Sequence, residues 1–137
     1  MNWWIAGLLA GVAAYLADWV MWSKVVMKGT EHLATPPPAG QPINMGPMLA
    51  KAAVLALAFG VLLAYLYGRF MGNLWVAGAG PLAGMEFATV LWLPTIALSS
   101  IGSGVWYDKA RPLLRATFWA WLVRMNVAGL VVGLLIK

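Results

Sequence analysis

Long apolar runs make up most of the chain, and charged residues fall mainly at the ends of these runs. A helix needs roughly 20 apolar residues to cross about 30 Å of hydrocarbon. The pattern meets this requirement four times and predicts membrane-spanning helices at about 3–22, 49–69, 81–101 and 113–136. Pro81 suits the first position of the third helix, and Pro94 predicts a kink within that helix.

The connections between these runs predict how the helices are arranged. Only the segment 23–47 is long, and its prolines at 36–38 are typical of a stiff spacer. The other connections are short, which makes successive helices antiparallel. We therefore predict one all-α domain over residues 1–137. It is an integral membrane four-helix bundle with antiparallel sequential helices and both termini on the same, outer side.

The composition restricts the class of protein. Hydrophobic residues make up 63% of the chain and charged residues 9%, and the mean hydropathy is +0.82. Soluble domains carry roughly 45–50% apolar and about 25% charged residues, so a water-exposed globule is excluded. The absence of cysteine excludes disulfides and thiolate chemistry. These values indicate a multi-pass membrane protein.

The positions of the basic residues predict the orientation, because cytoplasmic loops carry an excess of Lys and Arg. Most of them flank the first and third connections, whereas the opposite side holds Arg69 and Lys137. The first and third connections are therefore predicted to be cytoplasmic. The net charge of +5 is scattered over helix ends and forms no stripe, so it indicates the lipid bilayer as partner and no nucleic acid. The basic residues of the predicted cytoplasmic side are Lys24, Lys28, Lys51, Lys109, Arg111 and Arg115.

Small residues four positions apart predict where helices approach one another closely in a membrane. Helix 113–136 also carries two polar faces about 200° apart, with Asn126 on one and Arg124 on the other. One face can meet the other three helices, so the second predicts a homo-oligomer or a larger complex formed through this helix. The small residues at this spacing are Gly7, Gly11, Ala52, Ala56, Gly60, Gly80, Gly84, Gly129 and Gly133.

Ionisable residues within the spans form a candidate intramembrane polar site. A charge at the bilayer centre costs roughly 2.5–3.5 kcal/mol, so such side chains face protein or water. Asp18 and Arg115 are at similar depths in the predicted helices, so we expect them to pair. Glu86 is predicted to lie within about two turns of Arg124 in depth. Three interpretations stay open: neutralising pairs that lock the bundle, a path for protons or cations, and a site for an acidic ligand. The candidate residues are Asp18, Glu86, Arg115, Arg124 and Asn126.

The sequence indicates no catalytic residues, no metal site and no cofactor, and an enzyme is unsupported. The single histidine, His32, lies in the long loop. Trp92, Trp119 and Trp121 lie deep in their spans, where they either pack or offer a stacking surface for a quinone or sterol. A bound lipid, quinone or pigment is compatible with this composition.

Three short motifs stand out along the chain, Met1-Asn2-Trp3, Ala13-Ala14-Tyr15 and Arg111-Pro112-Leu113. With these motifs the chain resembles, over nearly its whole length, a family of small four-span bacterial membrane proteins classed as a domain of unknown function. The resemblance implies a four-span fold in a bacterial inner membrane and transfers no catalytic residues. We expect a structural or accessory membrane protein, oligomeric or part of a larger complex. The alternative is a small-solute or ion transporter or channel built on the intramembrane charges.

Overall fold

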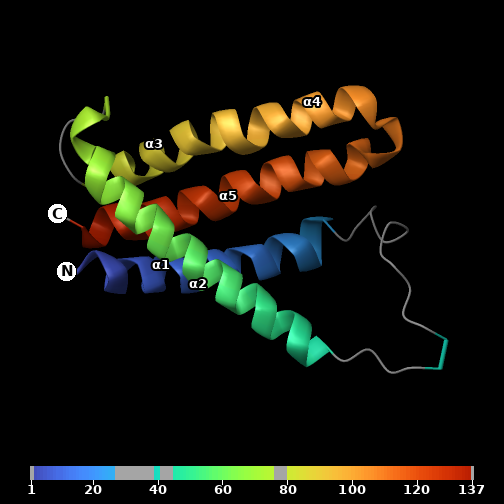
Figure 1. Ribbon diagram of the computed structural model, residues 1–137, viewed down its shortest axis with the longest axis horizontal. Coiled ribbons are helices and arrows are strands. Elements are labelled where there is room, and N and C mark those ends of the chain that lie inside the picture. The colour runs from blue at the N-terminus through green and yellow to red at the C-terminus, as the bar shows by residue number, and fades with distance from the viewer. Residues whose placement is uncertain (1, 27–38, 41–44, 76–79, 137) are drawn as a thin grey trace.

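The computed structural model describes residues 2–26, 39–40, 45–75 and 80–136, and nearly all of these are helical (Figure 1). Most of the predicted loop 23–47, including Lys28, His32 and the prolines at 36–38, lies outside the described residues, as does Lys137. The α-helices are α1 (Trp3–Met21), α2 (Met45–Phe70), α3 (Pro81–Trp92), α4 (Leu98–Trp106) and α5 (Arg111–Leu135).

Four helical segments are long and apolar enough to cross a membrane, which confirms the predicted all-α four-helix bundle. They cover Trp3–Lys24, Met45–Asn73, Pro81–Trp106 and Asp108–Leu135. Two helices begin earlier than predicted, α2 at residue 45 and α5 at residue 111. A proline lies in the first turn of each, where its missing N–H breaks no helical hydrogen bond, so the helix extends past it.

The third span changes its winding at the predicted position. After α3, residues Leu93–Ala97 form a π-helical segment, and α4 then continues to Trp106, beyond the predicted end at 101. Pro94 has no N–H and its ring conflicts with the carbonyl four residues earlier, so the helix widens there. The Thr95 hydroxyl donates a hydrogen bond of 2.6 Å to the Leu91 carbonyl beside this interruption.

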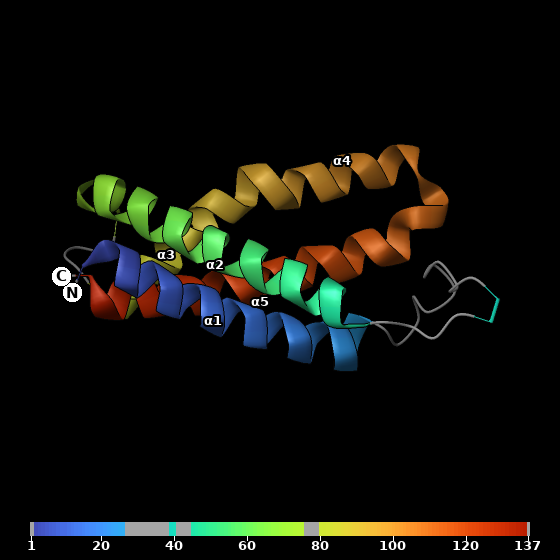
Figure 2. The same ribbon diagram turned by 60° about the horizontal axis from the view of Figure 1, so that its bottom comes forward.

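The helices pack as two pairs that are joined by a contact between α1 and α5. α1 packs along α2, α3 packs along α5, and α1 also contacts α5 extensively, so α5 lies between α1 and α3 (Figures 1 and 2). α2 and α3 are consecutive in the chain but meet only narrowly, and the Tyr67 and Phe87 rings are 5.6 Å apart there. Both termini lie at the same end of the bundle (Figures 1 and 2).

Backbone contact between glycines holds the α1–α2 crossing. A Cβ atom on Gly7 would lie 2.6 Å from the Val61 Cα, and one on Gly11 would lie 2.7 Å from the Ala56 carbonyl oxygen. Gly60 lies opposite Gly7 and Gly11 and has no room for a side chain. Helices this close gain dispersion contacts that lipid cannot supply, which is what associates helices in a bilayer.

The α3–α5 crossing is built in the same way. Gly84 lies against the Gly129 carbonyl, and Gly133 lies against the carbonyl of Gly80. Ala52 differs from the other residues of the small-residue pattern, because it is exposed and takes no part in these glycine contacts. Small residues spaced four positions apart therefore lie at both helix crossings. At each crossing the paired glycines leave no room for a larger side chain.

Candidate intramembrane polar site

An ion pair between two spans is the centre of the polar site. The Arg124 Nη1 lies 2.7 Å from the Asp18 Oδ2, across the contact between α5 and α1. The side chain of Arg124 is 12% exposed and that of Asp18 is 20% exposed. The predicted pairing of Asp18 with Arg115 is therefore wrong, and the partner of Arg124 is Asp18 and not Glu86, which the sequence placed within about two turns of it. The intramembrane arginine and aspartate neutralise each other.

The sequence-based pairing is wrong because depth along the helices does not distinguish the two arginines. α1 continues past the predicted end of the span at residue 22 as a π-helical segment, Trp22–Val26. Asp18 is about 22 Å along α1 from Trp3, and along α5 from Leu135 Arg124 is about 16 Å and Arg115 about 30 Å. The depth of Asp18 therefore lies between those of the two arginines, and the contact between α1 and α5 brings Asp18 to Arg124.

Two aromatic rings enclose the guanidinium of Arg124. Its central carbon lies 4.7 Å from the Phe59 ring centroid and 4.4 Å from that of Trp121. Cation–π contacts of this kind contribute about 0.5–2 kcal/mol, most when water is excluded. Because Phe59 belongs to α2, Arg124 connects α1, α2 and α5. Its Nε has no hydrogen-bond partner within the described residues.

The other two charged residues lie away from this pair. Glu86, near the start of α3, accepts a hydrogen bond of 2.7 Å from the backbone N–H of Trp75. Arg115 is exposed and lies in the first turns of α5, near the opposite end of the bundle. The four intramembrane charges therefore do not form one site, and among the described residues the ion pair between spans joins Asp18 and Arg124.

Asn126 lies on the other face of α5 and contacts α3. The Thr89 hydroxyl donates a hydrogen bond of 3.2 Å to the Asn126 Oδ1, and the Asn126 Nδ2 donates one of 3.0 Å to the Leu122 carbonyl. Arg124 contacts α1 and Asn126 contacts α3, so both polar faces of α5 are covered within one chain. The polar faces of α5 therefore do not require a second subunit, and an oligomer or larger complex formed through this helix stays a prediction.

The three deep tryptophans have different surroundings. Trp92 is 6% exposed, its Nε1 donates a hydrogen bond of 3.3 Å to the Phe118 carbonyl, and its ring packs edge-to-face on that of Phe118. Trp121 stacks on Arg124. Both rings therefore pack within the chain. Trp119 is exposed and lines a groove that the sequence pattern did not reveal.

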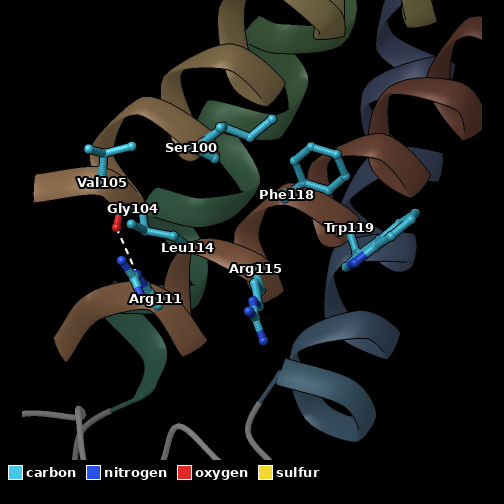
Figure 3. Close-up of a pocket in the computed structure, with 9 residues that line it drawn as sticks. Ser100, Gly104, Val105, Arg111, Leu114, Arg115, Phe118 and Trp119 are labelled. Carbon is cyan, nitrogen blue, oxygen red and sulfur yellow. Dashed lines mark hydrogen bonds between the residues drawn. The ribbon is translucent and has the colours of Figure 1, made fainter. Parts of the chain in front are cut away.

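This groove lies between α4 and the first turns of α5 (Figure 3). It has a volume of about 490 Å³ and includes none of Asp18, Glu86 and Arg124. Among the described residues, no group of His, Asp and Glu side chains could hold a metal ion. The residues that line the groove are Ser100, Ile101, Gly104, Val105, Arg111, Leu114, Arg115, Phe118 and Trp119.

Comparisons with models of protein families, with curated proteins and with solved structures found no match to this chain. The resemblance to a four-span family of unknown function stays a prediction. Four apolar helices identify a small multi-pass membrane protein.

Proposed function

We propose that this membrane protein has a structural or accessory role and does not carry a solute through its own core. The observation that supports this proposal is the Asp18–Arg124 pair. A transport site needs a charged group that can exchange its partner for the solute. Here the carboxylate and the guanidinium are 2.7 Å apart, and two aromatic rings cover the guanidinium.

The glycine crossings support the same proposal. At both crossings the backbones touch, so a path between α1 and α2, or between α3 and α5, would require the helices to separate. The groove between α4 and α5 does not include the ion pair. A path along the interior would therefore have to break the contacts that hold the bundle together.

An oligomer or a larger complex stays a prediction. The proposal uses no second subunit on α5, because α1 and α3 already cover the two polar faces of that helix. Native mass spectrometry of the full chain released from nanodiscs measures the number of copies directly.

A flux assay tests the proposal against the transporter alternative. The full chain is reconstituted in liposomes, and proton and potassium fluxes are measured with ion-sensitive dyes. We expect fluxes equal to those of protein-free liposomes, both for the natural chain and for Asp18→Asn. Asp108→Asn is the matched control, because Asp108 is exposed and its ion pair with Arg111 joins neighbouring turns. A flux that Asp18→Asn abolishes and Asp108→Asn preserves would contradict the proposal.

A further inference from the structure

The groove between α4 and α5 exists because α4 lies apart from the rest of the bundle. After the π-helical segment Leu93–Ala97, α4 packs mainly against α5 and has no buried residue (Figure 2). Gly104 contributes no side chain to fill the gap. A Cβ atom there would lie 3.9 Å from the Leu114 Cδ1 and 3.9 Å from the Arg111 Cγ, which is ordinary van der Waals contact, so a side chain could begin there without a clash. The volume of about 490 Å³ falls within the range of small-molecule sites, about 300–1,000 Å³.

The walls of the groove are apolar and face the bilayer. Ile101 and Val105 of α4 and Trp119 of α5 line it and are exposed. These residues belong to segments long and apolar enough to span a membrane. A molecule that occupies the groove can therefore enter it from the lipid phase, and its apolar part would cover side chains that the protein itself leaves uncovered.

Two arginines lie at one end of the groove (Figure 3). Arg111 is held by the protein, because its Nη2 lies 2.6 Å from the Asp108 Oδ1 and its Nε donates a hydrogen bond of 2.9 Å to the Gly104 carbonyl. Arg115 is exposed and has no ion pair or hydrogen bond with any described residue. It is a cation whose charge the described chain does not neutralise.

The position of Arg115 matches the boundary between hydrocarbon and headgroups. It lies about 6 Å along α5 from Arg111, at the start of the span. A long arginine stem can run along apolar surface while its guanidinium reaches the headgroups. An anion at that level, joined to an apolar tail that runs deeper, would satisfy both the cation and the apolar walls.

We propose that the groove binds an anionic phospholipid, with the phosphate paired to Arg115 and an acyl chain along Ile101, Val105 and Trp119. A soluble anion would leave the apolar walls uncovered, and a zwitterionic lipid brings a cation of its own beside its phosphate. A quinone would cover the walls but supply no charge to Arg115. This inference does not depend on the proposed structural or accessory role.

Lipid binding to the purified full chain tests the proposal by native mass spectrometry. Phosphatidylglycerol is titrated against phosphatidylcholine with the same acyl chains. A charge-assisted contact predicts about tenfold tighter binding of phosphatidylglycerol. Arg115→Gln should remove this preference, and Arg115→Lys should keep most of it. Gly104→Leu should weaken the binding of both lipids, because the new side chain fills the groove.

Lys109→Gln is the matched control, because Lys109 is exposed at the same end of the bundle and does not line the groove. It should keep the tenfold preference. The proposal is overturned if the two lipids bind equally, or if Lys109→Gln removes as much of the preference as Arg115→Gln. It is also overturned if inorganic phosphate alone displaces phosphatidylglycerol, since the site would then recognise a soluble anion.

Discussion

Removing one member of the Asp18–Arg124 pair should destabilise the bundle more than removing both. The test is a double-mutant cycle of Arg124→Met, Asp18→Leu and the combined variant. Each single change leaves one charge without its partner in a span where neither side chain is more than 20% exposed. The combined change leaves two apolar side chains of similar volume.

The magnitudes follow from the geometry. Breaking a buried pair from one side costs about 3–5 kcal/mol, and partial exposure places both single variants at the low end, about 3 kcal/mol. Arg124→Met also loses the contacts with Phe59 and Trp121, worth about 1 kcal/mol. That loss remains in the double variant, which should cost about 1 kcal/mol in total. Double-mutant cycles on interhelical hydrogen bonds in membranes give coupling energies of only about 0.6 kcal/mol on average, so each single loss could fall below about 3 kcal/mol. The test is therefore whether Asp18→Leu restores stability to Arg124→Met, and not how large each single loss is.

Reversible unfolding in mixed detergent micelles, followed by circular dichroism, gives the free energies of unfolding for the cycle. A second cycle with Arg124→Met and Glu86→Gln is the control. Glu86 accepts a hydrogen bond from Trp75, and within the described residues Arg124 forms its ion pair with Asp18, so these two changes should be additive. The reasoning is refuted if Glu86→Gln rescues Arg124→Met and Asp18→Leu does not.

Three further predictions concern the crossings and the orientation. Gly84→Leu should prevent α3 from packing on α5, because its Cβ would meet the Gly129 carbonyl, and the cooperative unfolding transition should be lost. Gly68→Leu is the control, since Gly68 lies in open space, and it should change the free energy of unfolding by no more than about 1 kcal/mol. Thr89→Val should lower the free energy of unfolding by about 0.6 kcal/mol through loss of the hydrogen bond to Asn126, and a loss above about 2 kcal/mol would point to a larger network. A reporter fused to the C-terminus should be active on the outer side of the membrane, and activity in the cytoplasm would contradict the orientation drawn from the basic residues.

The number of spans could be predicted from the sequence, because the thickness of the bilayer sets the length of apolar run that each span needs. The faces of close approach could also be predicted, apart from Ala52, since small residues such as Gly and Ala permit backbone contact. Which helices meet could not. The stripe of Gly7 and Gly11 specifies a face of α1 but not its partner, and the fold pairs it with Gly60, whereas it pairs Gly84 with Gly129.

The ion pair could not be predicted for a related reason. A depth estimate assumes straight helices that end at the predicted residues, and an error of one turn changes the depth by about 5.4 Å. Asp18 differs in depth by about 6 Å from Arg124 and by about 8 Å from Arg115, so an error of one turn decides which arginine is predicted as its partner. The groove likewise lies beside α4, which follows the π-helical segment around Pro94 and has no buried residue, and Gly104 supplies no side chain to fill it.

Water access to the centre of the bundle distinguishes a dry, paired core from a conduit most directly. The chain contains no cysteine, so a single introduced thiol can be followed in intact membranes with a charged, membrane-impermeant thiol reagent. Ala128→Cys places that thiol one turn from Arg124 at a fully buried position, and Asp108→Cys places it at an exposed one. We predict that Asp108→Cys reacts and that Ala128→Cys stays unlabelled from either side of the membrane. Labelling of Ala128→Cys at a rate close to that of Asp108→Cys would show water at the ion pair and would contradict a structural role for it.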